Sequence, residues 1–199
     1  MSANREEILS AIRRHRPPDA LLPDLRHNPW IKFSDPVAQF AGVLSSVGGN
    51  CVPAATTDDL RRELAAIPAY ASAKKVYSLI AGIECRNVDP HAITDPHVLQ
   101  DIDYAILPGH FAVAENAAVW VTDEGMPHRA IYFIAQHVAL VMPAANVVHN
   151  MHEAYERIRF ERSGFGCFIS GPSKTADIEQ SLVIGAHGAR SLTVFLFGC

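Results

Sequence analysis

Two stretches of the chain, residues 167–170 and 192–197, are apolar with almost no polar interruption. Strands that are buried on both faces have this pattern, whereas strands with one exposed face alternate apolar and polar side chains. We therefore expect both stretches to be central strands. Further strands are expected at residues 51–54 and 75–80, with a helix between them that is capped by Thr57. This alternation of strands and helices predicts an α/β fold with a mixed, mostly parallel sheet.

The middle of the chain has a different pattern, because its apolar runs follow one another closely. They cover residues 104–107, 117–122, 130–134 and 137–142. The connections between these runs are too short for crossover helices, so we expect antiparallel pairing in this region. Helices are expected at residues 4–15, from Pro36 with Ser34 or Asp35 as cap, and from Asn146 to about residue 160.

The first 30 residues differ from the rest of the chain in their proline content. Four prolines lie between residues 17 and 29, directly after the first expected helix. Proline ends helices and favours extended backbone, so this segment is expected to form an arm. We predict two parts: an N-terminal helix with a proline-rich arm at residues 1–30, and one α/β domain at residues 31–199.

The composition argues against several classes of protein. The net charge is -4 and the isoelectric point is about 6.2, which gives no basic surface for nucleic acid or anionic membranes. The polar N-terminus lacks a signal segment, and no run approaches the roughly 18 apolar residues of a membrane span. We therefore expect a cytoplasmic protein. The cysteines and histidines show no CxxC, HxxxH or HExxH spacing, so we expect no metal or cofactor bound by this chain alone.

Residues 171–177, Gly-Pro-Ser-Lys-Thr-Ala-Asp, follow an apolar run and form the first candidate site. Backbone N–H groups in such a turn can hold an anion, and Ser173, Lys174 and Thr175 can add donors. In an equally good interpretation, Ser173 or Thr175 caps a short helix that carries Asp177 in its first turn. Both interpretations stay open from the sequence.

Glu115 is the second candidate, because it interrupts an apolar stretch soon after the strand that ends at Pro108. Burying a carboxylate is costly unless it is paired or hydrogen-bonded. A buried glutamate with a raised pKa can act as a nucleophile or general base. Alternatively, Glu115 caps backbone amides of a tight turn or pairs with an arginine. His110 and His187 lie beside expected turns near these two segments.

The segment at residues 169–188 resembles the signature of the LUD-domain family, and within it the lactate utilisation protein C group. Residues 111–121 are similar to that family's Ala-x-Ala-Glu-Thr-Gly-Thr strand, and residues 137–141 stand in the place of its His-Ile-x-Val-Val strand. The resemblance covers essentially the whole chain. The sequence departs from the family at Glu115-Asn116-Ala117-Ala118, where the family has Glu-Thr-Gly-Thr; the change removes one glycine and two hydroxyls.

The resemblance implies a three-layer α/β/α fold of the NagB/RpiA/CoA-transferase type. It also implies an accessory role in oxidising L-lactate to pyruvate, beside partner subunits that hold the iron–sulfur clusters. We expect a small carboxylate or phosphate ligand between the Glu115 loop and residues 173–177, with Glu115 as the catalytic residue. The residues expected to bind this ligand are His110, Asn116, Gly171, Ser173, Lys174, Thr175, Asp177 and His187.

Two other functions fit the sequence. The first is a stand-alone enzyme of the CoA-transferase or cyclo-ligase type with Glu115 as nucleophile, which rests on fold analogy. The second is a scaffold without catalysis, in which the arm at residues 1–30 docks on a partner. The formation of a homo-oligomer is a further open possibility.

Overall fold

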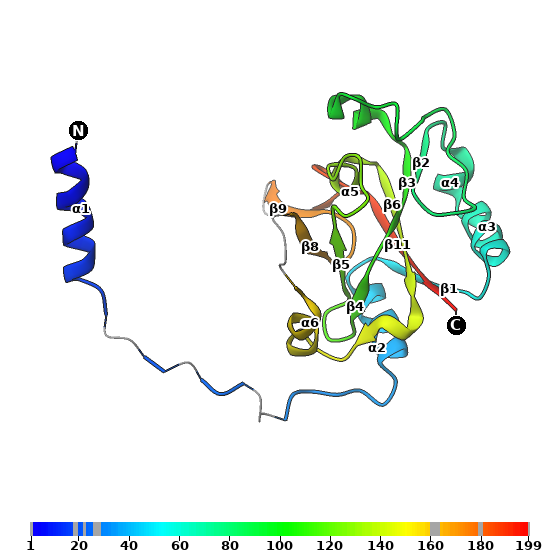
Figure 1. The fold of residues 1–199 in the computed structure, drawn as a ribbon. Coiled ribbons are helices and arrows are strands. Elements are labelled where there is room, and N and C mark those ends of the chain that lie inside the picture. Colours follow the sequence, from blue (N-terminus) through cyan, green and yellow to red (C-terminus); the bar gives the residue numbers. More distant parts are fainter. Residues whose placement is uncertain are drawn as a thin grey trace. The chain divides into compact units, whose positions relative to one another are not determined.

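The fold is described from a computed structural model, which covers residues 2–17, 20–21, 23–25, 29–159, 164–178 and 181–198. Contacts divide the chain into two units, residues 1–30 and 31–199. The first unit contains one helix, α1 (Ser2–Arg14), on which Ile8 and Ile12 are exposed. The second unit contains the remaining helices and strands (Figure 1).

The centre of the second unit is a five-stranded sheet in which all neighbouring strands are parallel. In spatial order its strands are β1 (Asn50–Ala54), β11 (Ser191–Phe197), β6 (His137–Pro143), β3 (Tyr104–Pro108) and β2 (Val76–Ser78). Strand β11 lies inside the sheet and is buried over residues 192–196, as its unbroken apolar run predicts. The predicted α/β fold with a mostly parallel sheet is confirmed.

Two helices, α3 (Thr57–Ala66) and α4 (Pro68–Ser72), cover one face of this parallel sheet (Figure 1). The buried side chains of Leu60 and Leu64 on α3 pack against Val76, Tyr104 and Phe195 of the sheet. Apolar residues one helical turn apart lie on the same side of a helix, which is why α3 presents both leucines to the sheet.

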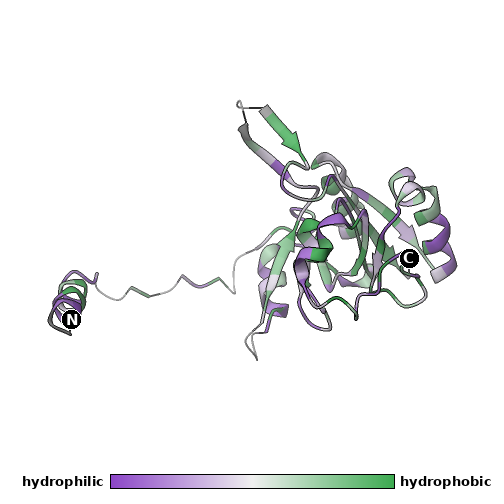
Figure 2. Ribbon diagram, turned by 90° about the horizontal axis from the view of Figure 1, so that it is seen from above, coloured by the Kyte–Doolittle hydropathy of each residue, from purple (hydrophilic) through white to green (hydrophobic). Residues whose placement is uncertain are grey.

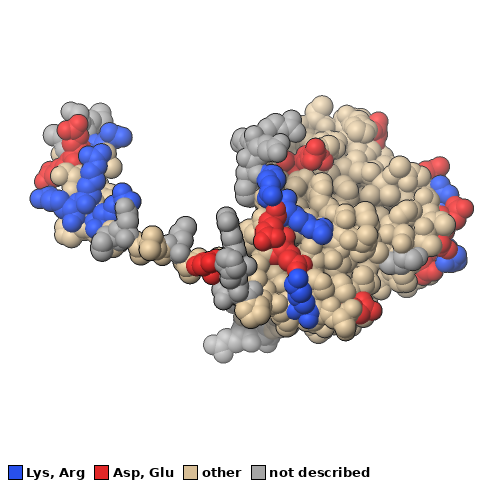
Figure 3. All heavy atoms as spheres, turned by 60° about the horizontal axis from the view of Figure 1, so that its bottom comes forward, with Lys and Arg blue, Asp and Glu red and all other residues tan. Residues whose placement is uncertain are grey.

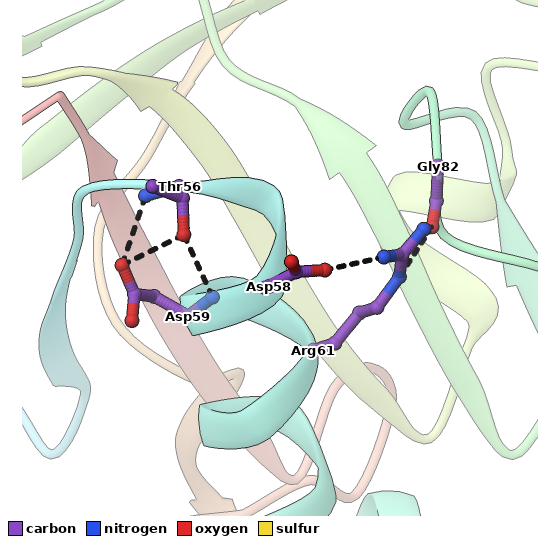
Figure 4. Close-up of polar contacts among 5 residues, drawn as sticks. All are labelled: Thr56, Asp58, Asp59, Arg61 and Gly82. Carbon is purple, nitrogen blue, oxygen red and sulfur yellow. Dashed lines mark hydrogen bonds and ion pairs between the residues drawn. The ribbon is translucent and has the colours of Figure 1, made fainter.

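The start of α3 shows how local sequence fixes a helix end. The cap is Thr56, one residue before the predicted Thr57. The hydroxyl oxygen of Thr56 accepts a hydrogen bond from the Asp59 N–H at 3.1 Å, and the Asp59 carboxylate accepts one from the Thr56 N–H at 3.0 Å (Figure 4). Arg61 then donates to the carbonyl oxygen of Gly82 at 2.8 and 3.0 Å, which ties α3 to the loop after β2.

A second sheet covers the other face of the parallel sheet. This mixed sheet has the order β7 (Val147–Val148), β4 (Phe111–Val113), β5 (Ala118–Thr122) and β8 (Gly166–Ile169). Together with α2 (Pro36–Ser46), its inner face forms a continuous apolar core with the parallel sheet, including Leu44, Val119 and Leu140. The outer face of the mixed sheet packs against α6 (Met151–Arg157) through Ala154.

Three of the strand predictions are wrong in whole or in part. Strands β3 and β6 are parallel neighbours, so the antiparallel prediction fails for them; it holds for β5, which is antiparallel to β4 and β8. Residues 131–134 form one helical turn, α5 (Ile131–Ile134), instead of a strand. Strand β8 is an edge strand of the mixed sheet and is only partly buried, although it was expected to be central.

Two further elements also differ from the sequence-based expectation. The helix expected from Asn146 to about residue 160 is α6, which begins at Met151 with Asn150 as its N-cap. It ends at Arg157, earlier than predicted, and the backbone at Ile158 is extended. Asn146 lies instead in the short 3-10 helix η2 (Ala144–Asn146), and a second one, η1 (Pro96–Asp101), precedes β3.

Residues 174–178 and 181–184 pair as an antiparallel hairpin, and within the described residues neither strand pairs with another sheet. The two strands, β9 (Lys174–Ile178) and β10 (Ser181–Ile184), make a separate two-stranded antiparallel sheet. Strand β10 is apolar (Figure 2), yet Leu182 and Ile184 are 64% and 50% exposed. The short helix predicted for this segment is absent.

Tyr77 in β2 is fully buried, and its hydroxyl has no hydrogen-bond partner among the described residues. Replacing it by phenylalanine removes a buried polar group without opening a cavity, so we expect Tyr77→Phe to raise the free energy of unfolding by about 1 kcal/mol. Desolvation raises the pKa of Tyr77 from its ordinary value of 10.0 to about 12. The fold therefore loses stability as the pH rises from about 10 to 12, and the variant is expected to lose less.

Urea unfolding near neutral pH and at about pH 11 measures both effects. The matched control is Tyr132→Phe, because the Tyr132 hydroxyl is also buried but donates to the Pro108 carbonyl at 2.9 Å. This control is expected to lose about 1 kcal/mol. A loss of stability in Tyr77→Phe equal to that of the control contradicts the prediction.

Candidate functional site

Glu115 lies in the turn between β4 and β5 and is exposed, which contradicts the prediction that it is buried. Its carboxylate accepts a hydrogen bond from the Met151 N–H at 3.0 Å, and its own N–H donates to the His149 carbonyl at 3.1 Å. Met151 is the first residue of α6, so the carboxylate caps that helix. The exposed, capping position agrees with the structural alternative that the sequence left open.

The capping contact leads to a prediction about stability. Glu115→Ala removes the acceptor for the Met151 N–H and is expected to lower the free energy of unfolding by about 1 kcal/mol, whereas Glu115→Gln keeps a neutral acceptor and is expected to lose less. Urea unfolding of the two variants gives the comparison. Unchanged stability in Glu115→Ala argues against the capping role.

The loop after Glu115 contacts the end of β8. The Asn116 side chain accepts a hydrogen bond from the Ala118 N–H at 3.1 Å, and the Asn116 carbonyl accepts one from the Ser170 hydroxyl at 2.8 Å. Ala117 is fully buried and has φ +53. Ala117 thus has a left-handed backbone conformation. It stands at the position of the glycine in the Glu-Thr-Gly-Thr motif that this segment resembles, and glycine adopts this conformation without strain.

Gly171 is buried against the C-terminal end of α2. It has φ +71, and a Cβ placed on it would lie 2.9 Å from the carbonyl oxygen of Val47. Lys174 also reaches this end of α2, because its ammonium group donates to the same Val47 carbonyl. The contacts of Gly171 and Lys174 therefore fix the base of the hairpin on α2.

Ser173 belongs to the hairpin base and neither caps a helix nor presents its amide to a ligand. Its N–H donates to the Ala189 carbonyl at 2.9 Å, and its carbonyl accepts from the Gly185 N–H at 2.9 Å. A Cβ on Gly188 would lie only 3.0 Å from the Ser173 Cβ, so the segment after β10 packs closely on Ser173. The prediction of a cradle of free amides is wrong at this residue.

The remaining candidates of this segment lie in the hairpin or just after it. Thr175 is paired with Val183 in the ladder between β9 and β10, and Asp177 lies further along β9. His187 is exposed in the bend at residues 185–188. Nothing is described of the Asp177 side chain, so its predicted ligand contact lies outside the described structure.

His110, between β3 and β4, is held from three sides. Its N–H donates to the Trp120 carbonyl at 2.9 Å, and its carbonyl accepts from the Asn146 side chain at 3.0 Å. Its ring Nε2 lies 2.8 Å from the Thr122 hydroxyl. These contacts fix the ring at the wall of a cavity.

The cavity has a volume of about 720 Å³ and lies beside the end of α6, on the outer side of the mixed sheet. This volume is within the range of small-molecule sites. Its walls include aromatic rings, polar groups of the β5 end, and the basic end of α6. The residues that matter most to the argument are His110, Phe111, Trp120, Thr122, Asp123 and Arg157.

Glycine shapes the aromatic wall of the cavity. A Cβ on Gly166 would lie 2.4 Å from the Trp120 indole, so this position leaves room for the ring to lie flat on β8. The centre of the Trp120 ring lies 6.3 Å from the centre of the Phe111 ring and 4.8 Å from that of the Phe168 ring. The result is a continuous aromatic surface next to His110.

Asp123 fixes another part of the cavity wall. One carboxylate oxygen accepts from the Phe165 N–H at 3.0 Å, and the other lies 3.7 Å from the Arg129 guanidinium. The Asp123 N–H in turn donates to the Phe165 carbonyl at 3.2 Å. Asp123 is therefore a structural group that holds the segment after β5 on the segment before β8.

Sequence reasoning found His110 but missed Arg157, Thr122 and Trp120. Two signals pointed to them: the Arg157-x-Arg159 pair at the end of an amphipathic helix, and the Thr122-Asp123 pair at the end of an apolar run.

Charged side chains of both signs gather over α6 and over α3, with uncharged surface between them (Figure 3).

Within the described residues there is neither a candidate metal site nor a candidate membrane-spanning helix. No group of three or more His, Cys, Asp or Glu side chains gathers there to hold a metal ion. Among those same residues, no helix combines the length and the apolar character that crossing a bilayer requires.

Comparisons with known proteins point to one family. The family model of the LUD domain matches residues 96–197. A relative from Shouchella clausii, named lactate utilization protein C, is 34% identical over 92 residues, which cover 43% of this chain and 40% of that protein. A protein of the same name from Geobacillus kaustophilus is 37% identical over 82 residues, covering 38% and 34%. The chain thus matches less than half of the length of either relative.

A solved structure shows the same fold. It is the crystal structure of a DUF162 family protein from Deinococcus radiodurans, which superposes with a TM-score of 0.60 over 85% of this chain and 100% of that chain. The sequences are 17% identical, so this likeness concerns the fold alone. The family model spans more than half of the chain, including every residue of the cavity wall. The chain therefore belongs to the LUD domain family.

Proposed function

We propose that this protein is an accessory component of a system that oxidises L-lactate to pyruvate. The observation that carries the proposal is its similarity to proteins named lactate utilization protein C, within a chain that belongs to the LUD domain family. The matched residues 96–197 contain His110, Arg157 and the other residues of the cavity wall. The support therefore concerns the same part of the chain as the candidate site.

The oxidation releases electrons, and in this proposal iron–sulfur subunits that accompany the chain accept them. In this proposal the clusters belong to those subunits. The described cysteines of this chain lie on different elements, Cys51 on β1, Cys85 after β2 and Cys167 on β8. A cluster needs several thiolates close together, and the described part of the chain offers no such group.

The proposed ligand of this chain is a small organic anion. The cavity beside α6 supports this choice, because Arg157 and Arg159 line it together with His110. Guanidinium groups bind carboxylates through charge-assisted hydrogen bonds. The geometry favours this cavity over the space between Glu115 and residues 173–177, because Glu115 caps α6 and Ser173 is used within the hairpin base.

Growth on lactate tests the proposed function. We expect deletion of the gene to abolish growth on L-lactate as sole carbon source and to leave growth on pyruvate unchanged, because the proposed defect precedes pyruvate. Reintroducing the wild-type gene is expected to restore growth on lactate. Co-purification of the tagged protein, followed by iron analysis, tests the partners.

Equal growth of the deletion strain and its parent on lactate removes the proposed role. Loss of growth on both carbon sources also counts against it, because the defect is then not specific to lactate oxidation. If growth depends on the gene but no iron-containing subunit co-purifies, the lactate role stands and the proposed partners are wrong.

A further inference from the structure

Arg157 is the group in the cavity that most clearly lacks a structural task. It is the last residue of α6, and its guanidinium carbon lies 5.9 Å from the centre of the Phe111 ring. Within the described residues, the guanidinium of Arg157 forms no hydrogen bond or ion pair. Stacking on an aromatic ring restricts the side chain while leaving its N–H donors available.

The neighbouring Arg159 has a different role. Its guanidinium donates to the carbonyl oxygens of Glu156 and Ile158, the latter at 3.0 Å. These carbonyls belong to the C-terminal end of α6, which has no further helical N–H groups to satisfy them. Arg159 therefore compensates the negative end of the helix. Of the two arginines in the described wall of the cavity, Arg157 is the one whose guanidinium can receive a ligand.

His110 supplies a second contact in the same cavity. Its Nε2 is engaged with the Thr122 hydroxyl at 2.8 Å, and the Thr122 oxygen also accepts from the Glu124 N–H at 3.3 Å. The ring is thereby held in one orientation, with Nδ1 as its remaining hydrogen-bonding atom. A ligand that offers an oxygen beside its anionic group can use both Arg157 and His110.

Two acidic residues of the cavity wall limit which anion fits. Asp123 and Glu124 line the same cavity as Arg157, so they oppose the binding of a dianion such as phosphate more than that of a monoanion. The aromatic surface of Phe111 and Trp120 suits a short carbon chain. Together these features favour a small monocarboxylate.

We propose that the cavity binds a small 2-hydroxy or 2-oxo monocarboxylate, with its carboxylate on Arg157 and its neighbouring oxygen on His110. The choice of this class among the monocarboxylates rests on the proposed function. The anion site itself rests on two observations: the Arg157 guanidinium has no hydrogen bond or ion pair within the described part of the chain, and the His110 ring is held by Thr122. Arg157 is thus a binding residue, and His110 sets specificity for the oxygen next to the carboxylate.

NMR titration of the full-length protein tests this site, with L-lactate, pyruvate, acetate and inorganic phosphate as separate probes. We expect lactate and pyruvate to shift the amide signals of residues around the cavity, and to bind more tightly than acetate or phosphate. Arg157→Gln is expected to weaken lactate binding about 10- to 100-fold, because a charge-assisted hydrogen bond is lost. Arg157→Lys keeps the charge without the planar fork and is expected to be intermediate.

Two controls make the result specific. Arg62→Gln removes a positive charge from α3, where Arg62 pairs with Asp59 at 2.8 Å, and is expected to bind lactate like the wild type. His110→Gln is expected to reduce the preference for lactate over acetate towards unity. Circular dichroism of each variant checks that the fold is kept, which is expected for Arg157 because it is exposed.

Several results overturn the inference. They are wild-type protein without lactate-induced shifts at the cavity, Arg157→Gln binding as tightly as the wild type, and phosphate binding more tightly than lactate. These outcomes are separate from the growth test. Suppose that deletion abolishes growth on lactate, that the gene with Arg157→Gln restores growth, and that this variant binds lactate as tightly as the wild type. The proposed role in lactate oxidation is then supported, and the proposed binding site is wrong.

Discussion

Replacing Gly171 with alanine is expected to lower the free energy of unfolding by about 3 kcal/mol. Gly171 has φ +71, and an L-residue there costs about 1–2 kcal/mol. The added Cβ would also lie 2.9 Å from the Val47 carbonyl oxygen and 3.0 Å from the Val47 Cγ2. Forcing apart closely packed groups costs about 1–3 kcal/mol more. Denaturation in urea, monitored by circular dichroism, measures the total.

Gly125 provides the matched control for this prediction. It has a similar φ of +69, but a Cβ placed on it meets nothing within 4 Å. Gly125→Ala is therefore expected to show the backbone cost alone, about 1 kcal/mol. The difference between the two variants isolates the contact with Val47. If Gly171→Ala and Gly125→Ala lose the same free energy of unfolding, the end of α2 moves away from the added Cβ at no cost in stability.

Replacing Asn150 with alanine is expected to lower the free energy of unfolding by about 2–3 kcal/mol. Asn150 is 1% exposed, and its side-chain oxygen accepts from the Glu153 N–H at 3.0 Å as the N-cap of α6. Its amide group donates to the Ile31 carbonyl at 2.9 Å. The substitution loses a helix cap, worth about 1 kcal/mol, and takes the partners from two hydrogen bonds that are partly shielded from water, those of the Glu153 N–H and the Ile31 carbonyl.

Asp35→Ala is the control for Asn150, because it removes the N-cap of α2 at an exposed position. Its loss is expected to be about 1 kcal/mol, since water can replace the missing contact. In Asn150→Asp the side chain can still accept from the Glu153 N–H as the cap of α6. It has no donor for the Ile31 carbonyl, so a carboxylate oxygen faces that carbonyl oxygen. A loss in Asn150→Ala no larger than that in Asp35→Ala shows that the burial of Asn150 adds nothing.

The fold class and several helix ends were predictable because they depend on short stretches of sequence. The nearly unbroken apolar run of β11 identified a strand buried on both faces. Pro36 marked the first turn of α2 and limited the predicted cap to Ser34 or Asp35, and Asp35 is the cap in the structure. In each case the decisive residues lie within a few positions of one another.

The division into two sheets was not predictable in the same way. Strands β3 and β6 are separated along the chain by β4, β5 and α5, yet they are paired in the parallel sheet. Close spacing of apolar runs suggested that sequence neighbours pair with one another. Which runs share a sheet depends instead on the core between the two sheets, which is a property of the whole domain.

Residues 131–134, Ile-Tyr-Phe-Ile, show a second limit. Their β-branched and aromatic side chains favour a strand, but Ile131 and Tyr132 are buried while Phe133 and Ile134 are exposed, as one helical turn allows. An apolar run of this length does not distinguish a strand from a buried helical turn. Burial of the Tyr132 hydroxyl against the Pro108 carbonyl becomes visible only in three dimensions.

The candidate site was predictable only in part, for the same reason. His110 was found because it follows a strand, which is where α/β proteins place polar groups. Arg157 and Thr122 line the same cavity but come from α6 and β5, and no local pattern links them. Glu115 was misjudged because apolar neighbours suggested burial, whereas the turn carries its side chain to the exposed start of α6.

The pairing of β1 with β11 has a consequence for how the domain folds. Strand β1 lies at the edge of the parallel sheet, and its partner strand carries residues such as Thr193, which is in register with Asn50. During synthesis, β1 must therefore wait for most of the domain to leave the ribosome before it can pair. Closing so long a loop slows folding, and the apolar surface of the sheet stays open to chaperones and to aggregation during this delay.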